Sequence, residues 1–283
     1  MGKIFYYCAL DIVTALGSVN YKWNHTRLAI TGHENILDEG FMMLGPHTEN
    51  RDPYLVGRAL RSYKLDGKRQ SKHVHFLYGD ELNKHPIGFR LRNRDSYKRH
   101  PTGFLRDLSD FNIDLLEHIE RFCFKEITGT EWYFKRVEHI PIPMRFSPDE
   151  RFDAEIKNRN LTRGEMRYLS RELPGLAKSY TDRGEPVAAF VDGPFTRKKE
   201  GDTFVDLHER GELFHGGSML AIQLGLPIVP FSIYRSPDRR LVQVDICEPV
   251  VDHLTWNIDR KDLTKIVAEI IDDKLSMHRE SRD

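Results

Sequence analysis

Short apolar runs that end at glycine or proline, separated by stretches with helical spacing, constrain the fold of this chain most strongly. The clearest runs cover residues 41–44, 74–78, 187–191 and 228–234. The first ends at Gly45-Pro46 and the third at Asp192-Gly193-Pro194, where turns are expected. Apolar runs of this length with such boundaries predict buried strands.

Helical patterns lie between these runs. Asp52-Pro53 resembles an N-cap followed by proline at the first helical position, which predicts a helix through about Arg61. Thr162-x-x-Glu165 has the form of a capping box, and Pro174 requires a break or a kink in the helix that follows. Further helices are predicted over residues 110–126, over residues 218–224 and over the stretch containing Leu263, Ile266, Val267, Ile270 and Leu275.

Strands that alternate with helices predict an α/β fold, with a mostly parallel or mixed central sheet flanked by helices. One domain is expected over residues 23–283, with a basic and helical insertion at about 88–130. Within residues 1–22, positions 3–19 carry an apolar helical stripe with Asp11 on the opposite face. We expect this helix either to lie on a membrane surface or to pack on the core, and both alternatives stay open.

Composition excludes several classes of protein. Lys plus Arg and Asp plus Glu both number 43, so no polyanionic partner such as nucleic acid is expected. The three cysteines are far apart and form no disulfide framework, which fits a reducing cytoplasm. No apolar stretch approaches the length of a membrane span, and the N-terminus lacks a signal-peptide pattern. We therefore expect a cytoplasmic protein that is peripheral on the inner face of the membrane if it contacts one.

A histidine followed five residues later by aspartate is a candidate catalytic pair, because the carboxylate can orient the imidazole as a general base. This spacing occurs at His33/Asp38, His47/Asp52, His75/Asp80 and His278/Asp283. Only His47 follows directly on a predicted strand, with its aspartate at the start of a predicted helix. Loops at the carboxyl ends of parallel strands are where α/β sheets bind ligands. His47 and Asp52 are therefore the predicted catalytic residues, although Asp52 could equally be a simple helix cap.

Residues 31–60, with Gly-x-Glu-Asn, a strand and His-x4-Asp-Pro in succession, resemble the first sequence block of the glycerolipid acyltransferases. These enzymes acylate glycerol-3-phosphate and lysophosphatidic acid. Three more segments are similar to the later blocks in the right order: HIPIPMR at 139–145, FVDGPFTR at 190–197 and LPIVPFSI at 226–233. The order of all four blocks, rather than any single one, carries the resemblance.

The resemblance implies a glycerol-3-phosphate acyltransferase-like fold in which His47 is the general base and Asp52 orients it. Arg145, Asp192, Gly193 and Arg197 would bind the phosphate or polar head of the acceptor. The co-substrate would be acyl-CoA or an acyl carrier protein, with no further cofactor and no metal. Val191 and Asp192 replace the proline and glutamate usual in the third block, so the differences from the family pattern lie in a block that would bind the acceptor.

Other clusters have weaker functional interpretations. The basic segment 88–106 could bind coenzyme A phosphates, a carrier protein or anionic lipid, or be a solvated loop. His73 and His75 would share one strand face, but a third ligand at suitable spacing is not evident, so zinc is not expected. No Gly-x-Ser-x-Gly motif supports a serine hydrolase. Two alternatives remain: acylation of a non-phosphorylated hydroxyl or amine, and a catalytically silent lipid-binding protein.

Overall fold

The computed structural model describes residues 27–47, 52–61, 63–65, 68–79, 138–143, 161–191, 213–237 and 240–280. The chain divides into a larger unit of residues 3–77 and 171–283 and a smaller unit of residues 78–170. The helix predicted within residues 1–22 and the insertion predicted at about 88–130 lie outside the described residues. None of the helices within these described ranges combines the length and apolar character that a membrane crossing requires.

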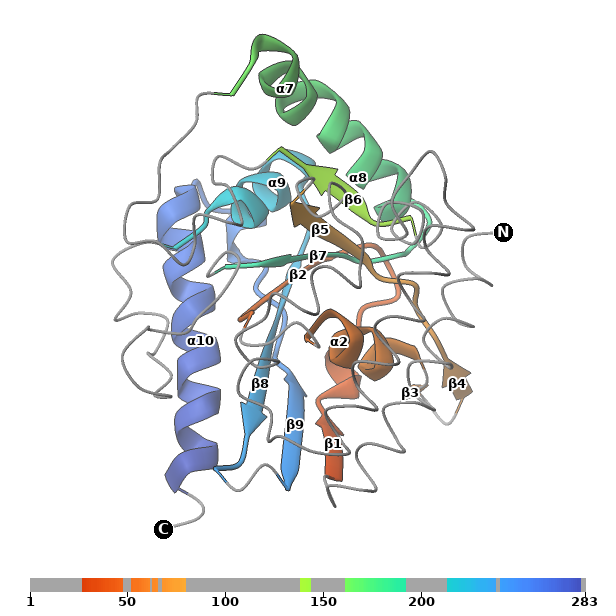
Figure 1. The fold of residues 1–283 in the computed structure, drawn as a ribbon, viewed down its shortest axis with the longest axis vertical. Coiled ribbons are helices and arrows are strands. Elements are labelled where there is room, and N and C mark those ends of the chain that lie inside the picture. The colour runs from red at the N-terminus through yellow and green to blue at the C-terminus, as the bar shows by residue number, and fades with distance from the viewer. Residues whose placement is uncertain are drawn as a thin grey trace, which may run out of the picture. The chain divides into compact units, whose positions relative to one another are not determined.

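A mixed sheet forms the centre of the larger unit (Figure 1). Its strands lie in the order β1 (Arg27–Thr31), β9 (Leu241–Ile246), β8 (Ile228–Arg235), β2 (Met42–Gly45), β7 (Val187–Phe190) and β5 (His75–Gly79). β5, β7, β2 and β8 run parallel to one another, whereas β9 is antiparallel to β8 and parallel to β1. The predicted α/β class, with a mixed central sheet flanked by helices, is confirmed.

Helices in the larger unit pack against this sheet. They are α2 (Asp52–Arg61), α8 (Leu173–Thr181), α9 (Gly216–Leu224) and α10 (Arg260–Glu280). The larger unit also contains the short 3-10 helices η1 (His33–Asn35) and η6 (Asp252–Leu254). α10 contacts β8 and β2, and α9 contacts β2 and β7. A two-stranded hairpin of β3 (Tyr63–Leu65) and β4 (Lys68–Gln70) follows α2.

The alternation of side chains along β8 assigns its two faces to different helices. Phe231 and its neighbours two positions away belong to the buried cluster that includes Leu55 and Leu60 of α2. On the opposite face, Ser232 donates a hydrogen bond to Asp245, which also accepts one from His278 of α10 at 2.8 Å. Both faces of β8 are therefore covered, which explains why most of its side chains are apolar.

Local sequence signals account for the helix boundaries. Gly225 ends α9 with a φ of 63°, a left-handed conformation that glycine adopts without a steric cost. α2 begins at Asp52, as the proline at the next position favours. Before α8 the chain forms a π-helical turn, η4 (Tyr168–Glu172), so the predicted break near Pro174 is confirmed.

Within the smaller unit, the described residues form β6 (Ile140–Ile142), α7 (Arg163–Arg167) and the first part of η4. The predicted capping box is present: Thr162 accepts from the Glu165 backbone N–H at 3.2 Å, and Glu165 accepts from the Thr162 backbone N–H at 2.7 Å. The Tyr168 hydroxyl donates to the Pro141 carbonyl at 2.8 Å and ties η4 to β6.

Candidate active site

His47 lies two residues beyond the carboxyl end of β2, at the edge of the sheet where α/β folds bind ligands. The close approach of β2 to β8 requires the glycine at position 45, because a Cβ atom there would collide with the Phe231 ring. Pro46 then leads the chain out of the sheet. The strand end predicted from the sequence therefore places His47 two residues after β2, a strand that contributes Met43 to the buried cluster.

The predicted catalytic pair is brought together. Nδ1 of His47 lies 3.4 Å from Oδ2 of Asp52, and we assign the imidazole as donor because an ionised carboxylate only accepts. The bond is long, as catalytic hydrogen bonds often are before substrate binds. Asp52 is fully buried, whereas the His47 side chain is 15 % exposed. An imidazole that is partly open to solvent and held by a buried carboxylate can act as a general base.

Arg235 is a third member of this site. Its guanidinium donates to Oδ1, the second carboxylate oxygen of Asp52, while only 10 % of its side chain is exposed. Arg235 is the last residue of β8 and shares the face of Phe231, so the strand directs it toward the start of α2. The buried negative charge of Asp52 is thus compensated, and both of its oxygens are engaged.

An aromatic side chain also stacks on the His47 ring. Phe190, the last residue of β7, stacks on it with ring centroids 4.3 Å apart and planes inclined by 17°. Phe190 in turn contacts Phe76 of the neighbouring strand β5 and Phe231 of β8, on the far side of β2. Three parallel strands thereby contribute to one site: β2 supplies His47, β7 its stacking partner and β8 the arginine.

The other histidines with the same spacing have different surroundings. His33 lies in η1 and stacks on Tyr63 at 6.0 Å. His75 is buried and bonded to Glu185, as expected for a structural group. His278, which we expected at a frayed end, is bonded to Asp245 and anchors α10 to the sheet. Among the described residues, His47 is therefore the member of this set held at the carboxyl edge of the parallel strands.

The residues predicted to bind the acceptor are not described. Arg145 lies outside the described ranges, and so do Asp192, Gly193 and Arg197. Their proximity to His47 therefore stays a prediction. The described strands β6 and β7 do end close to these positions in the sequence, at Ile142 and Phe190.

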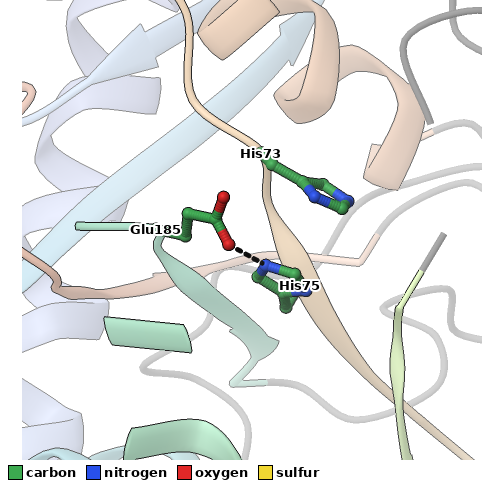
Figure 2. Close-up of side chains that lie close together, drawn as sticks. All are labelled: His73, His75 and Glu185. Atoms are coloured by element: carbon green, nitrogen blue, oxygen red, sulfur yellow. Dashed lines mark hydrogen bonds and ion pairs between the residues drawn. The ribbon is translucent and has the colours of Figure 1, made fainter. Parts of the chain in front are cut away.

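A group of metal-ligand type lies at the opposite edge of the sheet, at the amino ends of β5 and β7. His73, His75 and Glu185 are all buried, and their candidate ligand atoms lie within 4.8 Å of one another (Figure 2). Burial alone would raise the pKa of Glu185, but hydrogen bonds from His75 and Arg183 outweigh it and lower the pKa to about 2. Glu185 was not singled out from the sequence, because 110 residues separate it from His75.

No protein-family model and no curated protein matches this sequence. Among solved structures, the chain is similar to the 1-acyl-sn-glycerophosphate (LPA) acyltransferase PlsC from Thermotoga maritima. The two are 17 % identical in sequence, with a TM-score of 0.49. The similarity covers 95 % of this chain and 79 % of that chain.

Proposed function

We propose that this protein is an acyltransferase, which moves an acyl group from an acyl thioester to a hydroxyl of a glycerophosphate-type or lysophospholipid acceptor. The observation that carries the proposal is the pairing of His47 with the buried Asp52 at the carboxyl edge of the sheet. The four sequence blocks in order support the same class of reaction.

In this mechanism Nδ1 of His47 faces Asp52, so Nε2 is the ring nitrogen that takes the proton of the acceptor hydroxyl. The acceptor oxygen attacks the thioester carbonyl carbon, and the resulting tetrahedral intermediate expels a thiolate. The imidazolium returns its proton to that thiolate, so the products are the ester and a free thiol. Asp52 stabilises the transient imidazolium, and Arg235 holds Asp52 in place.

The donor and acceptor follow from the resemblance. We propose acyl-CoA or an acyl carrier protein as donor, with Arg145 and Arg197 binding the acceptor phosphate because a guanidinium meets two phosphate oxygens at once. Asp192 and Gly193 would complete that subsite. A lipid acceptor would bring the enzyme to a membrane surface as a peripheral protein.

A thiol-release assay tests the proposal. Purified protein is mixed with a long-chain acyl-CoA and a panel of acceptors: glycerol-3-phosphate, lysophosphatidic acid, a non-phosphorylated alcohol and an amine. His47→Ala is expected to lower turnover by about 10²–10⁴, the usual contribution of one general base. The fold should persist, because His47 lies beyond the strand end.

His33→Ala is the matched control, because it shares the His-x4-Asp spacing but lies in η1. It is expected to keep near-full activity. A folded His47→Ala protein with undiminished thiol release would disprove the mechanism. Binding of acyl-CoA with no turnover on any acceptor would instead identify a silent lipid-binding protein.

A further inference from the structure

The strand register brings His73, His75 and Glu185 together. His75 begins β5 and pairs in parallel with Val187 of β7, and its backbone N–H donates to the Pro186 carbonyl at 3.0 Å. Positions 73 and 75 share one face of this extended segment, and Glu185 precedes β7 by two residues. Three potential ligands therefore come from two adjacent, hydrogen-bonded segments of the larger unit.

The donor set and its dimensions suit a borderline divalent ion. Two imidazoles and one carboxylate are a common zinc combination. Ligands about 2.1 Å from zinc at a tetrahedral angle lie about 3.4 Å from each other. Nε2 of His75 and Oε2 of Glu185 are 3.0 Å apart, and the two imidazole centroids are 4.3 Å apart. Small adjustments would bring all three donors onto one ion.

The surroundings orient the ligands as outer partners do at metal sites. Tyr180 of α8 stacks on the His75 ring, with centroids 3.7 Å apart and planes inclined by 10°. Arg183 donates to Oε2 of Glu185 from Nε at 3.1 Å and from Nη2 at 2.8 Å. Ligating carboxylates are commonly held by such hydrogen bonds. Figure 2 shows the Glu185 carboxylate and the His75 ring turned toward each other.

Two cations oppose binding and set a limit on its strength. The Arg183 guanidinium contacts Glu185 directly, but its side chain is 49 % exposed and can move toward solvent. The buried Lys72 ammonium donates to the carbonyls of Asp38 and Gly184 at 2.7 Å each, and to that of Glu39 at 3.3 Å. We expect these charges to make the site weaker than a closed four-ligand zinc centre.

We propose that His73, His75 and Glu185 bind one divalent zinc-type ion, which fastens β5 to β7 at the sheet edge opposite His47. The fourth position would be taken by water. The site is structural, and the proposal is independent of acyl transfer, since no step of that reaction uses these residues.

Calorimetric titration of chelator-treated, full-length protein with Zn²⁺ tests this, after its accessible thiols have been alkylated to remove competing ligands. We expect one ion bound per chain. At a Zn²⁺ concentration about 100-fold above the dissociation constant, the ratio of folded to unfolded protein should rise about 100-fold. The unfolding temperature should then increase by about 5 °C or more, whereas Mg²⁺, which prefers oxygen ligands, should have no such effect.

Variants identify the ligands. His73→Gln and Glu185→Gln should each weaken Zn²⁺ binding at least about tenfold, as loss of even an outer partner commonly does. His253→Gln is the control for losing a buried histidine, because its Nε2 is bonded to the Leu226 carbonyl instead. Equal affinity in wild type and His73→Gln, or no saturable binding by wild type, would overturn the proposal. If both ligand variants fail to fold, the wild type alone decides: the proposal is overturned if Zn²⁺ does not raise its unfolding temperature.

Discussion

Replacement of Arg235 by methionine tests whether the buried charge of Asp52 depends on its arginine partner. Asp52 is fully buried, and its two oxygens are bonded to Arg235 and His47. Removal of one member of a buried ion pair typically costs about 3–5 kcal/mol, because the other charge stays uncompensated. Since the 3.4 Å bond from His47 is retained, we expect about 3 kcal/mol for Arg235→Met.

Urea unfolding measures this cost. With a slope of about 3 kcal/mol per M, the midpoint should fall by about 1 M. Asp52→Asn removes the charge itself, so the double variant with Arg235→Met should be no less stable than Arg235→Met alone. The control is Lys178→Met: its side chain is 62 % exposed and that of its partner Asp182 is 60 % exposed, so its loss should cost about 1 kcal/mol or less. A cost below about 1 kcal/mol for Arg235→Met, or additive effects in the double variant, would refute the reasoning.

The same variant has a kinetic signature that a purely structural arginine would not produce. Without Arg235, the Asp52 carboxylate is less firmly fixed and orients the His47 imidazole less well. We therefore expect kcat to fall while the KM for the acyl-CoA donor stays near its wild-type value. An unchanged kcat in a folded Arg235→Met protein would contradict a positioning role for this residue.

Two further predictions concern buried groups. Burial would raise the pKa of Asp245, but hydrogen bonds from Thr31, Gln243, His278 and Ser232 lower it. This carboxylate therefore stabilises the fold fully above its ordinary pKa and progressively less as the pH falls below it. Ser232→Ala removes a donor whose charge does not change with pH, and it should cost about 1–2 kcal/mol in urea at pH 7 and less near pH 3. An equal cost at both pH values would argue against the bond. Burial raises the pKa of the Cys247 thiol to about 11, so alkylation at pH 8, mapped by mass spectrometry, should reach it only after unfolding.

The parts of the fold that sequence reasoning predicted are those with local signals. β2 ends at Gly45, where the sequence predicted the end of a strand. The capping box at Thr162 correctly predicted the start of α7. By contrast, β1 and β9 were not predicted. The burial of β1 is only partial, and β9 places Gln243 and Asp245 among its apolar residues, so neither gives a continuous apolar run.

The sequence predicted the contact between site residues that are close in sequence and missed the contacts between residues that are far apart in sequence. His47 and Asp52 are five residues apart, and the strand–turn–helix pattern brings them together. Arg235 is 183 residues from Asp52 and ends a strand as an ordinary polar residue would, so nothing local marks it as a partner. Glu185 was not predicted for the same reason, since 110 residues separate it from His75. Such contacts depend on sheet register, which single-sequence patterns do not specify.

The order of strands also determines when, during synthesis, the chain can complete its sheet. β2 lies between β7 and β8, and β1 pairs with β9. Both β1 and β2 therefore pair with strands that are synthesised much later. The bond between Thr31 and Asp245, for example, joins residues 214 positions apart. At about 5–20 residues per second, a ribosome needs about 10–40 s to add that length of chain. Until β7 and then β8 have been synthesised, Met42, Met43 and Leu44 lack the strands that bury them. A nascent chain stalled before β8 should therefore be prone to aggregation and should retain a bound chaperone.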